Sequence, residues 1–240
     1  ITENNQRSLY LMSFWNYFSE GFFSEVTGGF RTGIEPNFQG QMKTRYYLVM
    51  SNLVIPRQTR IHLMYARRPL YRFKNTNLYD TWDAVMRINS NFNKRISFGG
   101  SIGRHLAPIR FLEIPTEGWA SINSIRFRYQ ATGRINLGIE YNSQKMTSRD
   151  KKTDYYSGGI STLRIRYQHN KSLGLKLFGM YSDFSNDFQL QPLITYQPSP
   201  FTIFYIGSNT NRQMEYLSYQ LVQDIEPRNK EYYIKFQYMF

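Results

Sequence analysis

Residues 230–240, at the C-terminus of the chain, read KEYYIKFQYMF. Every second side chain in this stretch is aromatic or aliphatic, and those between them are mixed in character. Successive side chains of an extended strand point to opposite faces, so the alternation places the apolar set on one face. The stretch therefore predicts a β-strand with one apolar face, formed by Tyr232, Ile234, Phe236, Tyr238 and Phe240.

The same alternation recurs along the whole chain, and no stretch has the pattern of a helix. The pattern predicts about thirteen strands, at residues 9–18, 22–34, 43–54, 59–66, 79–90, 95–104, 119–130, 134–142, 154–168, 172–183, 188–196, 201–210 and 230–240. No linker or change of composition divides the chain, so residues 1–240 are expected to form one domain.

The composition combines low hydropathy with many aromatic residues. Mean hydropathy is −0.54, 41% of the residues are hydrophobic, and 17% are aromatic. A transmembrane barrel has this composition, because only alternate residues of each strand face lipid and aromatic girdles mark both interfaces. A soluble all-β sandwich or barrel is the alternative. The sequence has no cysteine, which excludes disulfides and thiolate metal sites.

The predicted connections alternate in length. Short ones are expected at 19–21, 55–58, 91–94, 131–133, 169–171 and 197–200, and long ones at 67–78, 105–118, 143–153 and 211–229. Outer-membrane barrels have short periplasmic turns and long extracellular loops. The sequence therefore predicts an antiparallel transmembrane β-barrel with about 12–14 strands in this chain, in the outer membrane of a Gram-negative bacterium.

The strand count raises a question about closure. Bacterial single-chain barrels have even strand numbers. If Phe240 ends in the periplasm, counting back thirteen strands places residue 1 on the outer side. We therefore expect the chain to be the C-terminal portion of a longer protein, or another segment to complete the wall.

The charged residues are expected to face the interior of the barrel, because Arg or Lys on the lipid face costs about 2–4 kcal/mol at the bilayer midplane. The candidate lumen-lining residues are Arg60, Asp83, Arg87, Arg126, Arg128, Glu140, Arg164, Arg166, Lys176 and Lys235. They predict either a basic pore that favours anions or an interior filled by a network of Arg and carboxylate side chains.

The net charge of +13 admits two kinds of partner. A soluble protein this basic suggests nucleic acid, whereas a barrel suggests anionic lipid head groups or an anion-favouring lumen. The aromatic residues recur on strand faces and not in an RNA-binding motif, which favours lipid over nucleic acid. The basic loop at 143–153 contains Lys145, Arg149, Lys151 and Lys152; it is either a solvated tip or a contact for lipopolysaccharide phosphates or an acidic partner.

No catalytic or metal-binding motif is present. The three histidines, His62, His105 and His169, are not at metal-ligand spacing, and H-E-x-x-H does not occur. His62 is expected to point inward, and the other two to be solvated in loops or turns. The Gly-Gly pairs at 28–29, 99–100 and 158–159 precede no helix, so they predict bends or close backbone approach in a curved wall. No enzyme activity, cofactor or metal is therefore expected.

Two stretches resemble known proteins. The terminal Phe240, preceded by alternating aromatic residues, is similar to the closing strand of Gram-negative outer-membrane barrels, where this pattern is the insertion signal. The run QPLITYQPSPFTIFYIG at 191–207, together with the closing strand, resembles the C-terminal barrel of envelope proteins that carry an N-terminal family-9-like carbohydrate-binding domain. This resemblance covers about the last third of the chain and implies no catalytic residues. The carbohydrate-binding portion would lie upstream, so sugar binding is not assigned to these residues.

These observations favour a membrane-embedded scaffold or pore in a surface uptake or export assembly. The expected partners are outer-membrane lipid and lipopolysaccharide, the barrel-assembly machinery, and other envelope proteins or a missing N-terminal segment. Two alternatives remain: an outer-membrane enzyme with an active site at the extracellular rim, and a soluble basic β-domain that binds nucleic acid. Detergent dependence separates the last from a barrel.

Overall fold

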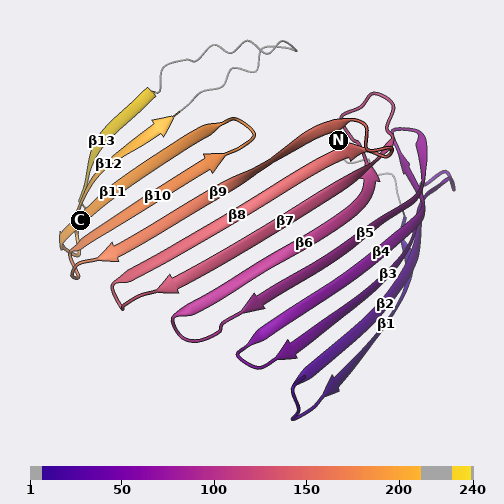
Figure 1. Cartoon of the computed structure of the whole chain (residues 1–240), viewed down its shortest axis with the longest axis horizontal. Helices are drawn as coiled ribbons and strands as arrows, with labels where there is room; N and C mark the ends of the chain where they lie inside the picture. The colour runs from indigo at the N-terminus through magenta and orange to yellow at the C-terminus, as the bar shows by residue number, and fades with distance from the viewer. Residues whose placement is uncertain (1–6, 212–228, 239–240) are drawn as a thin grey trace. The chain divides into compact units, whose positions relative to one another are not determined.

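The computed structural model describes residues 7–211 and 229–238, whose regular structure is entirely β-strand. Thirteen strands form one sheet in which each strand lies beside the next in the sequence (Figure 1). The strands are β1 (Leu9–Phe18), β2 (Glu25–Pro36), β3 (Met42–Ile55), β4 (Thr59–Phe73), β5 (Thr76–Ser90), β6 (Ile96–Pro108), β7 (Glu117–Gln130), β8 (Ile135–Ser148), β9 (Asp154–Gln168), β10 (Leu173–Ser182), β11 (Asp187–Ser199), β12 (Thr202–Asn211) and β13 (Asn229–Tyr238). The prediction of an all-β antiparallel sheet is confirmed. Within the described ranges there is no helix with the length and apolar character needed to span a bilayer.

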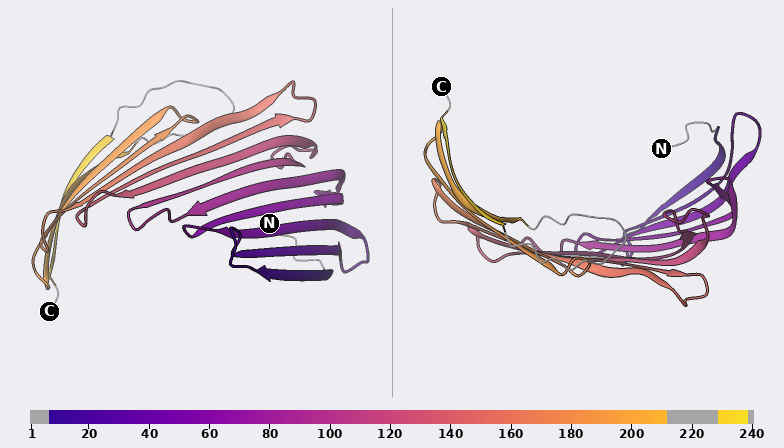
Figure 2. Two further views of the ribbon diagram at one scale, coloured as in Figure 1. Left: turned by 60° about the horizontal axis from the view of Figure 1, so that its bottom comes forward. Right: turned by 90° about the horizontal axis from the view of Figure 1, so that it is seen from above.

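The chain divides into two compact units. Unit 1 contains residues 1–125 and 142–158, and unit 2 contains residues 126–141 and 159–240. The division runs through β7, β8 and β9, so each of these strands contributes to both units. Figure 2 follows the same order of strands from two further directions.

In unit 1 the register collects apolar side chains on one face. Leu63 of β4 lies opposite Met86 of β5, and Met86 lies opposite Ile102 of β6. These three side chains are 39%, 44% and 48% exposed, so no second layer of protein covers them. We call this surface the apolar face of unit 1 and the opposite surface its polar face.

In unit 2 the apolar row is continuous across four strands. Leu175 of β10 is paired with Ile194 of β11, which continues through Ile206 of β12 to Ile234 of β13. At the end of the strands where β13 ends, the ring centroids of Tyr196 and Phe204 lie 6.2 Å apart, and those of Phe204 and Phe236 lie 5.0 Å apart. This surface is the apolar face of unit 2.

The closing strand has the predicted form. Alternation in β13 places its predicted apolar set on the apolar face of unit 2, where these side chains are exposed: Tyr232, Ile234, Phe236 and Tyr238. Phe240 lies outside the described residues. Residues 212–228, most of the long connection predicted before β13, also lie outside them.

The predicted long connection at 67–78 is wrong. Strand β4 continues to Phe73 and β5 begins at Thr76, with only Lys74 and Asn75 between them. Both turn residues have positive φ, at 46° and 61°, as in the two-residue turns that suit twisted hairpins. The polar composition of the segment does not end the strands, because both continue through it and Leu78 of β5 is only 2% exposed.

Two other predicted long loops are shorter than expected, because the strands on either side of each continue into it. The connection at 105–118 reduces to residues 109–116, and the one at 143–153 reduces to residues 149–153. The regular alternation of short and long connections is therefore weaker than the sequence indicates.

Glycines in the strands lie beneath aromatic rings of the neighbouring strand. A Cβ atom built on Gly28 would lie 2.0 Å from the ring of Trp15, and one on Gly207 would lie 2.7 Å from the ring of Tyr233. In both pairs the aromatic residue belongs to an edge strand, β1 or β13, and the glycine to the adjacent strand. The expected close approach at Gly28-Gly29 is therefore that of a ring against the backbone.

Candidate functional site

The polar face of unit 1 carries three of the predicted lumen-lining residues. Arg60, Asp83 and Arg87 come from β4 and β5, and the pairs Arg60–Asn89 and His62–Arg87 place the arginines on one face. Asp83 lies on that face as well. It is four residues from Arg87 on β5 and is paired with Ala66, which is four residues from His62 on β4, and even spacings along a strand keep side chains on one face. The prediction that these residues share a face with His62 agrees with this register.

Asp83 is the centre of a charged cluster on this face. Its Oδ2 atom lies 2.6 Å from Nη1 of Arg68, and its Oδ1 atom lies 2.8 Å from Nδ1 of His105. The side chains of Asp83 and His105 are only 16% exposed, so the carboxylate is shielded from water by its two partners. A carboxylate held in this way balances part of the positive charge of the face.

His105 is not the solvated loop residue that the sequence predicts. It lies in β6 and faces Asp83 across the sheet. Arg68 was missed altogether, because it falls in the segment expected to be a loop. The alternation Arg60, His62, Met64, Ala66, Arg68 continues without a break, and this was the signal that could have found it.

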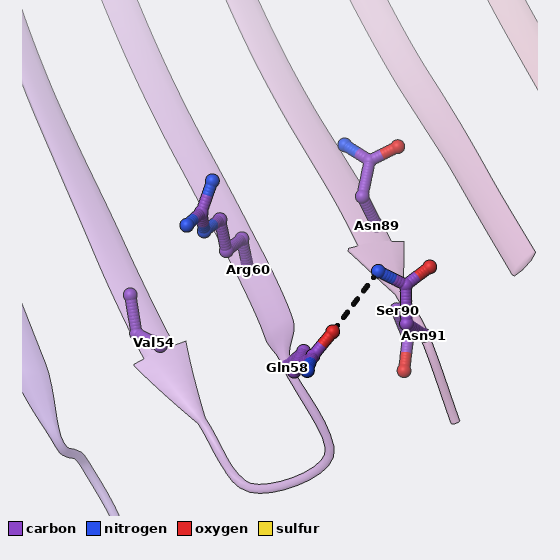
Figure 3. Close-up of a pocket in the computed structure, with 6 residues that line it drawn as sticks. All are labelled: Val54, Gln58, Arg60, Asn89, Ser90 and Asn91. Atoms are coloured by element: carbon purple, nitrogen blue, oxygen red, sulfur yellow. Dashed lines mark hydrogen bonds between the residues drawn. The ribbon is translucent and has the colours of Figure 1, made fainter. Parts of the chain in front are cut away.

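A shallow hollow lies at one end of the polar face, beside the β3–β4 turn. It has a volume of about 300 Å³ and is lined by Val54, Gln58, Arg60, Asn89, Ser90 and Asn91. Asn91 closes one side by donating from Nδ2 to Oε1 of Gln58 over 3.2 Å (Figure 3). One guanidinium among amide and hydroxyl groups gives the hollow a chemistry suited to an anion or a polar solute.

In unit 2 the structure brings three of the predicted residues into direct contact. Glu140 of β8 lies between Arg126 of β7 and Arg164 of β9, with N–O distances of 3.4 and 3.5 Å. The carboxylate side chain is 20% exposed, while the arginine side chains are 50% and 62% exposed. Because the two arginines remain largely in water, the contacts are weak individually and leave one net positive charge.

The other predicted residues of unit 2 form a basic surface. Arg166 of β9 is directly opposite Lys176 of β10. Like charges in this position repel one another, so the pair is tolerable only where water and counter-ions screen it. Arg128 of β7 is exposed, and Lys235 of β13 lies opposite Tyr205 on the face away from Ile234.

No arrangement of metal ligands accompanies these charges. Among the residues described, no group of three or more His, Cys, Asp or Glu side chains is placed to hold a metal ion. His62 Nδ1 lies 2.7 Å from Oδ1 of Asn52, which makes it a hydrogen-bonding residue of the polar face.

The fold is similar to that of a solved bacterial receptor. The ferric enterobactin receptor of Pseudomonas aeruginosa, solved in complex with enterobactin, matches with a TM-score of 0.50 and 10% identity over 95% of this chain and 45% of the receptor. The chain therefore spans less than half the length of that receptor. The toluene transporter TodX of P. putida matches at a TM-score of 0.29 and 8% identity, over 87% of this chain and 84% of the transporter, a score from which no structural inference follows.

No protein-family model matches the chain, and no curated protein matches it. The resemblance to envelope proteins with a carbohydrate-binding domain thus stays a prediction at the level of that family. The fold class does not depend on it: the chain has the antiparallel sheet of an outer-membrane β-barrel.

Proposed function

We propose that the chain forms a contiguous part of the wall of an outer-membrane β-barrel that serves as a scaffold or pore in a surface uptake or export assembly. In this proposal the apolar faces of both units contact lipid and the polar faces line an aqueous interior. The observation that carries it is the single-layer sheet whose exposed apolar row lies opposite a charged surface.

The membrane assignment has a physical reason: the apolar face and the polar face of the sheet require different solvents. Each unit has its own exposed apolar row, which includes Ile102 in unit 1 and Ile234 in unit 2, and monomeric soluble proteins rarely present such rows to water. The opposite face carries arginines that would be costly in hydrocarbon. A bilayer on one side and water on the other satisfies both faces.

The comparison with the enterobactin receptor supports transport at the coarse level, since that receptor shares the fold. The resemblance of residues 191–207 to barrels of larger envelope proteins supports a cell-surface setting. The closing strand, with its exposed Phe236 and Tyr238, supports recognition by the barrel-assembly machinery.

The odd number of strands in the sheet limits how the wall of the proposed barrel can close. In a meander of thirteen antiparallel strands, β1 and β13 run in the same direction. Joining them directly would create a parallel pair, whereas an odd number of additional strands closes the wall with antiparallel pairs throughout. A second copy inserted in the same orientation would also give parallel junctions, so we favour additional strands of another sequence segment.

The test is ion conduction by the full-length protein in planar bilayers. Because the polar face has an excess of Arg and Lys, we expect channels whose reversal potential in a KCl gradient indicates preference for chloride. Replacing Arg166 and Lys176 by Gln should move the reversal potential toward zero. The matched control replaces Lys94 and Arg95, both in the β5–β6 connection, and should leave it unchanged.

One outcome would narrow the proposal to its scaffold form, and another would overturn it. A folded barrel that never conducts indicates a filled interior and supports the scaffold over the pore. A full-length protein that remains folded and monodisperse without detergent would overturn the membrane assignment itself.

A further inference from the structure

The apolar face of unit 1 changes character toward the strand ends that carry the β4–β5, β6–β7 and β8–β9 connections. Aromatic rings form a belt there: the centroids of Tyr65 and Trp82 are 6.3 Å apart, and those of Trp82 and Trp119 are 5.7 Å apart. Trp and Tyr concentrate where hydrocarbon meets head groups in membrane proteins. The belt therefore indicates the level of one membrane interface.

Arg104 lies on the same face, next to this belt. The register pairs it with Ala84 of β5, two residues from Trp82, and Ile102 of the exposed apolar row lies two residues from it on β6. Its Nη1 atom donates to Oγ of Ser121 and to Oδ1 of Asn123, each over 2.7 Å, and to the carbonyl oxygen of Gly103 over 2.9 Å. All three acceptors are neutral, so these contacts hold the guanidinium in place and leave its charge uncompensated.

A second cation lies over the belt. Nζ of Lys151 is 5.6 Å from the ring centroid of Trp119, and the indole Nε1 of Trp119 donates to the carbonyl oxygen of Arg149 over 3.0 Å. The indole thus fixes the 149–153 connection against the end of the apolar face. Among the described residues, no carboxylate lies within ion-pair distance of Arg104 or Lys151.

Three of the nearby acidic residues are already engaged. Asp154 pairs with Lys145 at 2.9 Å, and Glu117 pairs with Arg149 at 3.5 Å. Asp150 accepts hydrogen bonds from the hydroxyl of Ser148 and the amide of Lys152, which hold its pKa below the usual value and keep it ionised. The cations of this region outnumber its carboxylates, so it attracts anions even with every pair formed.

We propose that Arg104 and Lys151, with the indole of Trp119, bind the phosphate groups of a phosphorylated glycolipid in the outer leaflet. The inference rests on the proposed function, with β13 ending in the periplasm, because the β4–β5, β6–β7 and β8–β9 connections then lie on the extracellular side. A phosphate satisfies cations at the lipid boundary with charge-assisted hydrogen bonds, and guanidinium groups match it with two parallel donors. Lipid is the expected occupant because Arg104 emerges from the apolar face and not from the polar one.

The test measures lipid bound to the full-length protein by native mass spectrometry. Delipidated protein is titrated in mild detergent with diphosphorylated lipid A, with dephosphorylated lipid A, with phosphatidylglycerol and with inorganic phosphate. We expect diphosphorylated lipid A to bind most tightly. The variant with Arg104→Gln and Lys151→Gln should lose about ten- to a hundredfold in affinity, as expected for losing hydrogen bonds to a charged group.

A matched control comes from the opposite end of the strands. Arg57, in the β3–β4 turn, lies 4.0 Å from the ring centroid of Phe92 and so forms a similar basic–aromatic pair at the other interface. Arg57→Gln should leave lipid A affinity unchanged. Arg104→Lys, which keeps the charge but not the planar fork, should restore part of the affinity lost in Arg104→Gln.

The outcomes separate this site from the barrel itself. Heat-dependent mobility on gels reports whether each variant is still a folded barrel. A folded barrel that binds phosphatidylglycerol or dephosphorylated lipid A as tightly as lipid A, or whose double variant retains full affinity, overturns the site alone. Binding of inorganic phosphate in place of lipid would show a free-anion site and would also overturn the lipid assignment. A protein that needs no detergent overturns both proposals.

Discussion

The two edge strands of the sheet differ in the chemistry of their faces. Strand β13 alternates, with Ile234 and Phe236 on one face and Glu231 and Lys235 on the other. Strand β1 reads LYLMSFWNYF and has no charged residue on either face. On the polar side of the sheet it exposes Tyr10, Met12, Phe14 and Phe18.

This difference indicates which environment, lipid, water or protein, suits each face of the two edge strands. Strand β13 has the pattern of a wall strand between lipid and water. Strand β1 presents apolar side chains on both sides, so the side that continues the polar face is suited to contact with protein and not with open water. We therefore expect protein, and not water, to cover this side of β1 in the assembled barrel.

The largest effects should come from placing a charge on each face of the two edges. Ile234→Arg puts a guanidinium on the lipid side of β13 and should lower the free energy of unfolding by about 2–4 kcal/mol if the position is near the midplane. Gln237→Arg, on the other face of the same strand, should change it little. Urea unfolding in lipid vesicles measures both.

The equivalent pair on β1 tests the comparison itself. Leu11→Glu lies on the apolar face, and Met12→Glu lies on the polar side opposite Arg31, where a carboxylate avoids the repulsion that a second arginine would introduce. If protein covers that side of β1, both substitutions are destabilising. A neutral Met12→Glu would show that β1 faces water there, as proposed for β13.

A smaller loss is expected from disturbing the glycine beneath the edge aromatic residue. In Gly28→Ala the new methyl group would overlap the ring of Trp15, so the ring must leave its position over β2. Overpacking of this kind typically costs about 1–3 kcal/mol. Gly133→Ala is the matched control, because a Cβ at Gly133 has nothing within 4 Å. Equal unfolding midpoints for the two variants would contradict the role of the ring.

The smallest effect concerns a cation–π contact at the β1 edge. The Cζ atom of Arg31 lies 4.2 Å from the ring centroid of Tyr10. Tyr10→Leu keeps an apolar side chain but removes the ring, and should lower the free energy of unfolding by about 0.5–1 kcal/mol. Tyr232→Leu on β13 serves as the control and should have less effect. A loss as large at Tyr232 would show that general apolar contact, and not the cation, stabilises the edge.

The sequence alone predicts the strands well because one face of each needs apolar residues, which imposes alternation. It fails in β4 beyond Ala66, because the charged and polar residues there interrupt the apolar alternation and resemble a loop. It also cannot predict partners across strands. Two examples are the ion pairs of Asp83 with Arg68 and His105, and the packing of the Trp15 ring over Gly28. Both depend on the register between strands, which no single strand encodes.

The β4–β5 hairpin projects from the outer surface of the proposed barrel. From Arg68 to Phe73 the strand rises about 3.3 Å per residue, so the tip stands roughly 15–20 Å beyond the aromatic belt. Nζ of Lys74 contacts the carbonyl oxygens of Arg110 and Leu112 at 3.3 and 3.5 Å, tying the tip to the next connection. An antibody or a phage would therefore meet a rigid epitope at this point, and the Lys74–Asn75 turn is the natural position at which to display a foreign peptide.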